Sequence, residues 1–309
     1  SGGKESTVLL ALIKLCEEVY TIPVGGIPAV FSNTGIELGV TVDFVKWVRD
    51  HWYSNVQMIR PEVSFDWVLK NKGKPMKSKL KSEILHRWHT GSRTDYVKER
   101  LLYCTTSHNV VMARTKIADK DMHLLHDDFP ITASPMCCNY LKKKPLGKYA
   151  KDNNIAGEIM GIRVAEEGAR KLAAQKRVKE GGKLCTWFGH GLEHKAPIID
   201  WTDEDVAEVV ADRQIKCHAL YYDDGIFNPK HRLGCMGCPM ASDNGLKEFV
   251  KHPKLVKAWI RAGQEYLDTH PNVVAHKKFN NAYECDTITN SAHNNRNMSK
   301  LLFLISLTI

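Results

Sequence analysis

The stretch Ser1-Gly2-Gly3-Lys4-Glu5-Ser6-Thr7 opens the sequence and leads directly into an apolar run. Its two glycines lack Cβ atoms, so the backbone can turn sharply and direct successive N–H groups to one point. A helix after this turn would add the positive end of its dipole, and Lys4 would add a mobile full charge. The stretch therefore predicts a phosphate-binding loop, with a glycine-rich turn capped by Ser6 as the alternative. Its spacing fits neither GxxxxGK[ST] nor GxGxxG, which excludes those two nucleotide motifs.

Apolar spacing along the chain predicts alternating helices and strands. We expect helices over residues 6–20, 41–51 and 246–267, a basic helix ending at 179, a helix from 203 onward, and strands over residues 27–31, 56–59 and 157–161. The first helix should place Cys16 in the core, and Thr202 with Asp205 forms a capping box. This alternation predicts an α/β domain with a parallel sheet, in which ligands bind at the carboxyl ends of the strands.

The composition is that of a soluble globular protein, with 43% apolar and 26% charged residues among 309. The net charge of +9, from 44 Lys and Arg against 35 Asp and Glu, favours polyanionic partners such as nucleotides or nucleic acid. No apolar run approaches the roughly 20 residues of a membrane span, and no secretory signal precedes the first motif. We therefore expect a cytoplasmic protein that does not contact the membrane, with reduced cysteines.

The two ends of the sequence raise expectations of their own. A phosphate loop of this type follows a buried parallel strand, and the sequence contains none before Ser1. We therefore expect that the numbering begins inside a longer gene or that the central strand is missing from a fragment. The apolar residues 301–309 predict an edge strand or a truncation artefact.

Lysines crowd the segment that follows the second predicted strand: Lys70, Lys72, Lys74, Lys77, Lys79 and Lys81. Such a run predicts a solvated surface, with contact to a phosphate backbone as the alternative.

Four cysteines form two pairs, Cys137-Cys138 and Cys235-Met-Gly-Cys238. A Cys-x-x-Cys turn presents two thiolates to one metal centre, and a second pair completes four soft ligands. Adjacent cysteines have difficulty placing both sulfurs on one zinc ion, whereas a [4Fe–4S] cube offers them separate iron corners. The set therefore favours a [4Fe–4S] cluster, and tetrahedral Zn²⁺, with Cys217 or His218 beside the second pair, is the alternative.

Several motifs follow one another in a recognisable order. They are Cys137-Cys138 with Lys-x-x-Pro-Leu at 142–146, Gly161-Ile-Arg163 with Glu166 and Arg170, PIIDWTDEDV at 197–206, His218-x-Leu220-Tyr221, and Gly234-Cys-x-x-Cys238. Together they resemble the phosphoadenosine phosphosulfate (PAPS) reductase family. The opening SGGKES is similar to the SGGKDS signature of the PP-loop ATP pyrophosphatases, with Glu5 in place of aspartate. The resemblance extends from Ser1 to about Pro239.

The resemblance implies an adenine nucleotide alpha-hydrolase-like fold. This is a three-layer α/β sandwich with a mostly parallel sheet over residues 1–240, followed by a helical C-terminal extension over 241–309. The nucleotide pocket should lie at the carboxyl strand ends between Gly2 and Gly161. In the cluster-bearing branch, which includes adenylyl sulfate reductases and the ATP pyrophosphatase of DNA phosphorothioation systems, the cysteines hold a [4Fe–4S] cluster. That role carries over to Cys137, Cys138, Cys235 and Cys238.

Two departures separate the chain from the reductases of this family. Gly-Gly-Lys is intact, whereas the reductases have a degenerate phosphate loop, and their Glu-Cys-Gly motif is replaced here by Glu284-Cys285-Asp286. The flanking carboxylates would raise the pKa of the Cys285 thiol and disfavour a nucleophilic thiolate. Both departures favour the ATP-cleaving relatives.

The leading hypothesis is an enzyme that binds ATP, lets an acceptor attack the α phosphorus and releases pyrophosphate, leaving an adenylated acceptor for sulfur transfer. The expected catalytic residues are Lys4, Glu5 and Arg163, with Glu5 as a Mg²⁺ ligand. Nucleotide contacts are expected from Ser1, Gly2, Gly3, Lys4, Ser6, Thr7, Thr34, Gly35, Glu37, Gly161, Arg163 and Arg170.

The alternative hypothesis is a sulfonucleotide reductase that produces sulfite, with Cys285 or another exposed thiol as its nucleophile. A pure nucleic-acid-binding module would leave the phosphate loop and the cysteine pairs unexplained. The expected partners are an adenine nucleotide and either nucleic acid or a sulfur-donor protein.

Overall fold

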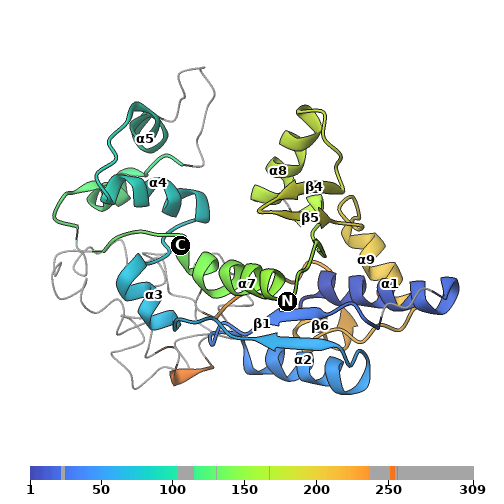
Figure 1. Cartoon of the computed structure of the whole chain (residues 1–309). Coiled ribbons are helices and arrows are strands. Elements are labelled where there is room, and N and C mark those ends of the chain that lie inside the picture. Colours follow the sequence, from blue (N-terminus) through green and yellow to red (C-terminus); the bar gives the residue numbers. More distant parts are fainter. Residues whose placement is uncertain are drawn as a thin grey trace. The chain divides into compact units, whose positions relative to one another are not determined.

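The computed structural model describes residues 1–21, 25–103, 115–129, 131–166, 168–236, 238, 251–254 and 256 (Figure 1). The chain divides into two compact units, and each unit combines two segments that are far apart in the sequence. Unit 1 consists of Ser1–Pro61 and Lys143–Leu233, and unit 2 consists of Glu62–Lys142 and Gly234–Ile309. The expected helix over 246–267, the domain boundary after 240 and Cys285 lie largely or wholly outside the described residues, so they stay predictions.

Unit 1 alternates helices with short strands. In chain order its elements are α1 (Lys4–Tyr20), β1 (Ala29–Ser32), α2 (Gly39–His51), β2 (Val56–Ile59), α7 (Lys144–Asp152), β3 (Gly157–Ile159), η4 (Val164–Glu166), α8 (Gly168–Lys179), β4 (Thr186–Gly189), β5 (Leu192–Lys195), α9 (Asp203–Asp212), η5 (Ala219–Tyr221), β6 (Tyr222–Asp223) and β7 (Ile226–Phe227). The expected helices over 6–20 and 41–51 and the expected strand over 56–59 are thereby confirmed.

Among the described residues, the strands form three small sheets. β1 and β2 run parallel, with Ala29 opposite Val56 and Ser32 opposite Ile59, and helix α2 connects them. β5 pairs with β3 in parallel and with β4 in antiparallel orientation, and β6 and β7 form a hairpin. Parallel strands joined through helices are the α/β pattern that the sequence indicates. A mostly parallel sheet within a three-layer sandwich stays a prediction.

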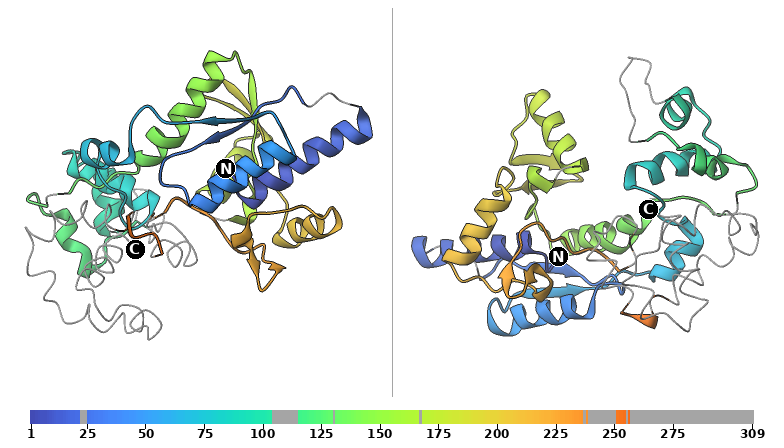
Figure 2. Two further views of the ribbon diagram at one scale, coloured as in Figure 1. Left: turned by 90° about the horizontal axis from the view of Figure 1, so that it is seen from below. Right: turned by 180° about the vertical axis from the view of Figure 1, so that it is seen from behind.

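Helix α2 packs on the parallel pair, and helix α1 packs on α9 (Figure 2). The first contact buries Phe31, Phe44 and Val56, and the second buries Val8 and Val206. Cys16, which we expected in the core, is only half-buried, because the inward-facing positions of α1 become less buried after its first two turns.

The capping box at Thr202 is confirmed. The Thr202 hydroxyl accepts a hydrogen bond from the Asp205 amide at 3.1 Å, and the Asp205 carboxylate accepts one from the Thr202 amide at 2.7 Å. This cap starts α9 at Asp203, and it therefore fixes where the Asp203 carboxylate stands.

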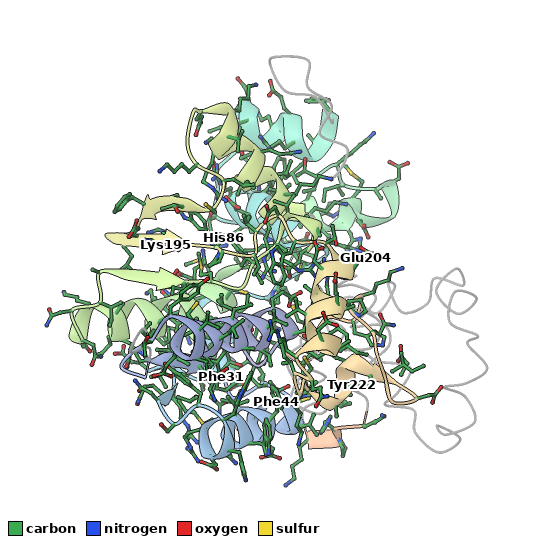
Figure 3. All side chains as sticks on the ribbon, turned by 90° about the vertical axis from the view of Figure 1, so that its right-hand side faces the viewer. Phe31, Phe44, His86, Lys195, Glu204 and Tyr222 are labelled. Atoms are coloured by element: carbon green, nitrogen blue, oxygen red, sulfur yellow. The ribbon has the colours of Figure 1, made fainter. Side chains whose placement is uncertain are left out.

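Unit 2 contains short helices: α3 (Phe65–Lys72), α4 (Lys79–His89), α5 (Asp95–Lys98), η1 (Glu99–Tyr103), η2 (Asp119–Leu125) and α6 (Met136–Cys138), with η3 (Asn139–Lys143) at its boundary with unit 1. The lysine-dense segment thus builds α3 and the start of α4 in addition to surface. The Lys77 ammonium is an exception to the solvated pattern, because it pairs with Asp121 at 3.0 Å with both side chains mostly buried. Figure 3 shows how densely side chains fill the molecule.

Within the described residues, no helix combines the length and the apolar character that crossing a membrane requires.

Gly161 packs against the backbone at the start of α1. A Cβ atom at this position would lie 2.6 Å from the Glu5 carbonyl oxygen and 2.9 Å from the Ser6 nitrogen. We expect Gly161→Ala to lower the free energy of unfolding by roughly 1–3 kcal/mol, because the backbone cannot yield as a flexible side chain would. Gly147→Ala is the matched control, since a Cβ there meets nothing within 4 Å; it should gain up to about 1 kcal/mol of helix propensity. Urea unfolding of both variants measures these free energies. Equal stabilities of the two variants would contradict the close packing of Gly161 against the Glu5 backbone.

Candidate phosphate-binding site

The turn before α1 is built by the two glycines and by hydroxyl groups. Gly2 has a φ of +69°, and a Cβ there would lie 2.9 Å from Thr41 Cγ2, so only glycine fits without strain. The hydroxyls of Ser6 and Thr7 donate to the Gly3 carbonyl at 2.8 and 3.0 Å. Ser1 Oγ lies 3.0 Å from Ser6 Oγ and accepts from the Gly3 amide. These hydroxyls shape the turn, and Gly3, which has no side chain, stands at the N-cap of α1.

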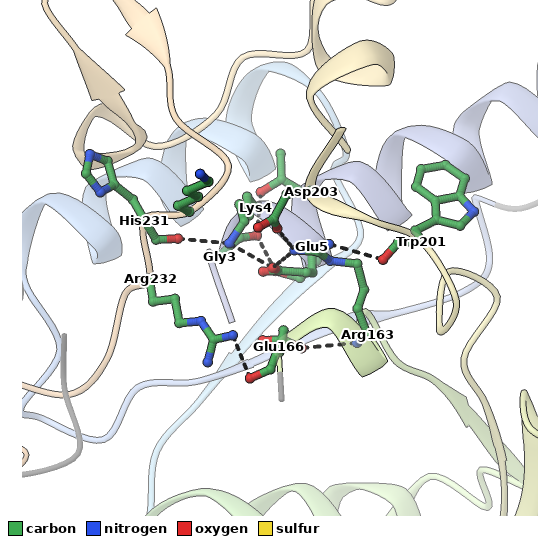
Figure 4. Close-up of polar contacts among 12 residues, drawn as sticks. Gly3, Lys4, Glu5, Arg163, Glu166, Trp201, Asp203, His231 and Arg232 are labelled. Carbon is green, nitrogen blue, oxygen red and sulfur yellow. Dashed lines mark hydrogen bonds and ion pairs between the residues drawn. The ribbon is translucent and has the colours of Figure 1, made fainter. Parts of the chain in front are cut away.

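Four charged side chains meet beside this turn, and we call Lys4, Glu5, Arg163 and Asp203 the charge cluster (Figure 4). Glu5 Oε1 lies 2.8 Å from Lys4 Nζ and 3.2 Å from Arg163 Nη2. The same Nη2 atom lies 2.7 Å from Asp203 Oδ1. The cluster thus joins the first turns of α1 and α9 through the guanidinium group that follows β3.

Lys4 is buried, contrary to the mobile charge that the sequence suggested. It is the first residue of α1, and 2% of it is exposed. Its ammonium group donates to the His231 carbonyl at 2.8 Å and lies 5.2 Å from the centre of the Tyr221 ring. The tertiary contacts of residues 221 and 231 therefore place this lysine.

Arg163 is the most deeply buried charge of the cluster, with 1% exposed. Its Nη1 donates to the Trp201 carbonyl at 3.2 Å, and Nη2 serves both carboxylates. Its Nε is also buried, yet it has no hydrogen-bond partner among the residues that the structure describes. A buried donor without a partner costs about 1–3 kcal/mol, so this nitrogen would gain from an acceptor supplied by a ligand.

The charge cluster sets the ionisation of its members. Burial opposes the charged form of Glu5, but Lys4, the Glu5 backbone amide and Arg163 together hold its pKa below the ordinary value. Burial likewise opposes the charged form of Arg163, but Asp203 and Glu5 raise its pKa. Glu5 and Arg163 are therefore both held in their charged forms by the cluster.

Arg170, for which we expected a nucleotide contact, forms an ion pair with Glu166 and is about half exposed. The Glu166 carboxylate also accepts a hydrogen bond from the Arg163 amide at 3.1 Å. Among the described residues, Arg170 thus connects to the charge cluster through Glu166, and its contact with a nucleotide stays a prediction.

The loop that follows β1 has local hydrogen bonds. Thr34 donates to Glu37 Oε1 at 3.1 Å, and Gly35, at a φ of +81°, donates its amide to Asn33 Oδ1 at 3.1 Å. The loop stands at the carboxyl end of a parallel strand, as the sequence indicates. Its contact with adenosine stays a prediction.

Cys137, Cys138, Cys235 and Cys238 are all half-buried and all belong to unit 2. A hydrogen bond with Cys138, burial, and the nearby thiols of Cys138, Cys238 and Cys235 all raise the pKa of Cys137, so the other three thiols lie within electrostatic range of Cys137. Among the described side chains, no three of His, Cys, Asp or Glu are already spaced to hold a metal ion. The four cysteines therefore remain predicted ligands.

Cys217 and His218, considered for the zinc alternative, belong to the core of unit 1. Burial raises the pKa of Cys217 to about 12. His218 accepts from the Leu220 amide at one ring nitrogen and lies 3.1 Å from Thr41 Oγ1 at the other. Metal ligation would break one of these contacts, which disfavours a zinc site that includes His218.

Sequence reasoning missed four contributors to the site: Trp201, Asp203, Tyr221 and His231. Asp203 was explained by the start of a helix, and Trp201 and Tyr221 by the family motifs that contain them. His231 contributes its backbone carbonyl, which any residue carries, so no side-chain signal exists for it.

The comparison with protein families adds one finding. Residues 94–241 match the family model of the phosphoadenosine phosphosulfate reductase domain. The match supports the resemblance to this sulfonucleotide-related family, whose members are typically enzymes and whose fold is adenine nucleotide alpha-hydrolase-like. It includes Arg163, Asp203 and the four paired cysteines, whereas the turn at Gly2-Gly3 lies outside it. No curated protein matches the chain.

Glu5→Gln should lower the free energy of unfolding by about 3–5 kcal/mol, because it removes the shared partner of two buried cations. The folded pKa of Glu5 lies below its ordinary value of 4.5. The stability difference between wild type and variant should therefore be constant above pH 4.5 or so, and shrink as the pH falls through the lower, folded pKa. Denaturant unfolding at several pH values measures it. Glu18→Gln on the exposed part of α1 is the control, with an expected change in the free energy of unfolding under about 0.5 kcal/mol. If Glu18→Gln destabilises the protein as much as Glu5→Gln, the ion pairs of Glu5 are not the cause of the loss.

Proposed function

We propose that the chain is an ATP pyrophosphatase of the PAPS reductase family that adenylates an acceptor for sulfur transfer. The single observation that carries this proposal is the buried Arg163 Nε, which has no hydrogen-bond partner among the described residues, beside an intact Gly-Gly-Lys turn. An anion at the N-terminus of α1 would give this nitrogen its acceptor and would also face the positive end of the helix dipole.

In the proposed reaction, an acceptor oxygen attacks the α phosphorus of ATP. The new O–P bond forms as the bond from that phosphorus to the bridging oxygen breaks, and pyrophosphate leaves with the electron pair. The acceptor proton passes to solvent. Such a reaction needs positioned positive charge at the leaving group more than a nucleophilic side chain.

The charge cluster can supply that charge. Lys4 and Arg163 are buried and paired with carboxylates, so they would donate to phosphate oxygens where water is largely excluded. Glu5 and Asp203 fit Mg²⁺, because carboxylates are the ligand type that this hard cation prefers. The ion would supply further neutralisation of phosphate charge.

For the cysteine set we propose a [4Fe–4S] cluster, with Zn²⁺ as the alternative. Four half-buried thiols within electrostatic range are the soft donor set that iron–sulfur clusters take. The cluster would supply redox or structural chemistry to unit 2. We propose a sulfur-donor protein as the partner and nucleic acid as one class of acceptor, in a cytoplasmic setting.

A sulfonucleotide reductase is the second candidate, and the match to the reductase domain favours it. In that reaction a protein thiolate attacks the sulfate sulfur, an S–S bond forms as the bond from that sulfur to the phosphate oxygen breaks, and the nucleotide leaves with the electron pair. A second thiol then attacks the protein sulfur, forms a disulfide with it, loses its proton to solvent and releases sulfite. Cys285 is the candidate nucleophile, although its flanking carboxylates disfavour the thiolate.

Anaerobically purified full chain, incubated with ATP and separately with adenylyl sulfate and its 3′-phosphorylated form, should release pyrophosphate only. Lys4→Ala should slow this release about 30- to 1,000-fold, the loss of one charge-assisted contact in a dry site. Lys46→Ala, an exposed lysine of α2, is the control and should keep wild-type turnover. Sulfite from a sulfonucleotide, abolished by Cys285→Ser, would instead establish the reductase.

Cys137→Ser should abolish the binding of iron and sulfide by the anaerobic protein, because it removes one of four ligands. Cys185→Ser, at an exposed cysteine of unit 1, should leave both unchanged. Metal analysis of the two variants tests the assignment of Cys137 as a cluster ligand. Stoichiometric zinc without iron in the wild type would overturn it in favour of the zinc site.

A further inference from the structure

Residues 228–232 form a strap that follows the β6–β7 hairpin and reaches the charge cluster. The Asn228 amide donates to the Tyr221 carbonyl at 2.7 Å, and the Asn228 side chain accepts from the Lys230 amide at 2.9 Å. The His231 amide donates to the Asn228 carbonyl at 3.2 Å. The strap is therefore a tight turn fixed to the core at Tyr221.

Asp223, the last residue of β6, holds the strap from its other side. Its two carboxylate oxygens lie 2.7 and 2.8 Å from His231 Nε2, and one of them accepts from Asn228 Nδ2 at 2.8 Å. Asn228 first and His231 second lower the pKa of Asp223, which keeps it ionised at neutral pH. One carboxylate thus connects the start and the far part of the strap.

Of two neighbouring residues of the strap, one contacts the charge cluster and the other contacts Glu166 beside it (Figure 4). The His231 carbonyl accepts the hydrogen bond from Lys4 Nζ at 2.8 Å. Arg232 Nη2 donates to the Glu166 carbonyl at 2.6 Å, and the Glu166 side chain accepts from the Arg163 amide. The position of the strap therefore determines where the ammonium group of Lys4 stands.

We propose that Asp223 and His231 are positioning residues for Lys4. Their side chains clamp the strap, so that the His231 carbonyl holds the ammonium group in the charge cluster before a nucleotide arrives. The inference rests on the proposed function in one respect, namely that Lys4 binds the departing pyrophosphate. A lysine has a long flexible side chain, and a charge that is already in place lowers the cost of ordering it in the transition state.

The alternative is that the Asp223–His231 pair only stabilises the hairpin. The two explanations differ in what they predict, because the Asp223 side chain is 58% exposed. An ion pair whose carboxylate is exposed contributes little to global stability, so Asp223→Asn should hardly change the melting temperature. A positioning role predicts that Asp223→Asn nevertheless makes the Lys4 ammonium group more accessible.

Acylation of lysines in the full chain by acetic anhydride, followed by peptide mass spectrometry, tests the proposal without any nucleotide. In Asp223→Asn, Lys4 should be labelled about tenfold faster than in the wild type, as expected when one charge-assisted hydrogen bond is weakened. Lys14 on the same helix should keep its rate, which excludes general loosening. Asp224→Asn, the same change at the next, exposed residue, is the matched control and should leave both rates unchanged.

The kinetic arm uses the same two variants. Asp223→Asn should lower kcat for pyrophosphate release about tenfold with little change in KM, and Asp224→Asn should not. Unchanged Lys4 labelling in Asp223→Asn, or faster labelling with unchanged kcat, would overturn the positioning role. If Lys4 labelling rises but even the wild type releases no pyrophosphate, the clamp on Lys4 stands and the proposed function fails.

Discussion

The ion pairs of Arg163 with Glu5 and Asp203 are the interaction on which unit 1 depends. The guanidinium group is nearly inaccessible to solvent, so its charge is tolerable only because two carboxylates and the Trp201 carbonyl surround it. Those partners come from the first turns of α1 and α9 and from the segment before α9. The cluster therefore holds in register the elements from which the phosphate-binding turn is built.

This arrangement explains how two cations can be buried beside a helix N-terminus. Lys4 and Arg163 would repel each other and the positive end of α1, and Glu5 compensates both. One buried hydrogen-bond donor of the cluster is left unsatisfied, because Arg163 Nε lacks an acceptor among the described residues. A phosphate oxygen would give Arg163 Nε an acceptor, so the charge cluster favours the binding of an anion.

The sequence carried enough information for the local elements and for most of the site. The glycine pair at positions 2 and 3 and the capping box at Thr202 are readable from residue type and spacing. The close approach of Gly161 to the Glu5 backbone is not, because it brings together segments that are far apart in the sequence. The burial of Lys4 was not readable, because it depends on the His231 carbonyl and the Tyr221 ring, which come from the distant end of unit 1. The ion pair of Arg170 with Glu166, one helical turn away, was not read from the sequence either. The nucleotide contact of Arg170 stays a prediction.

A crystal structure of the full chain with α,β-methylene-ATP, which cannot be cleaved between the α and β phosphates, tests the central claim most directly. The account predicts phosphate oxygens at the N-terminus of α1, within hydrogen-bond distance of Arg163 Nε and Lys4 Nζ. A nucleotide bound elsewhere, with Arg163 Nε still without an acceptor, would contradict it.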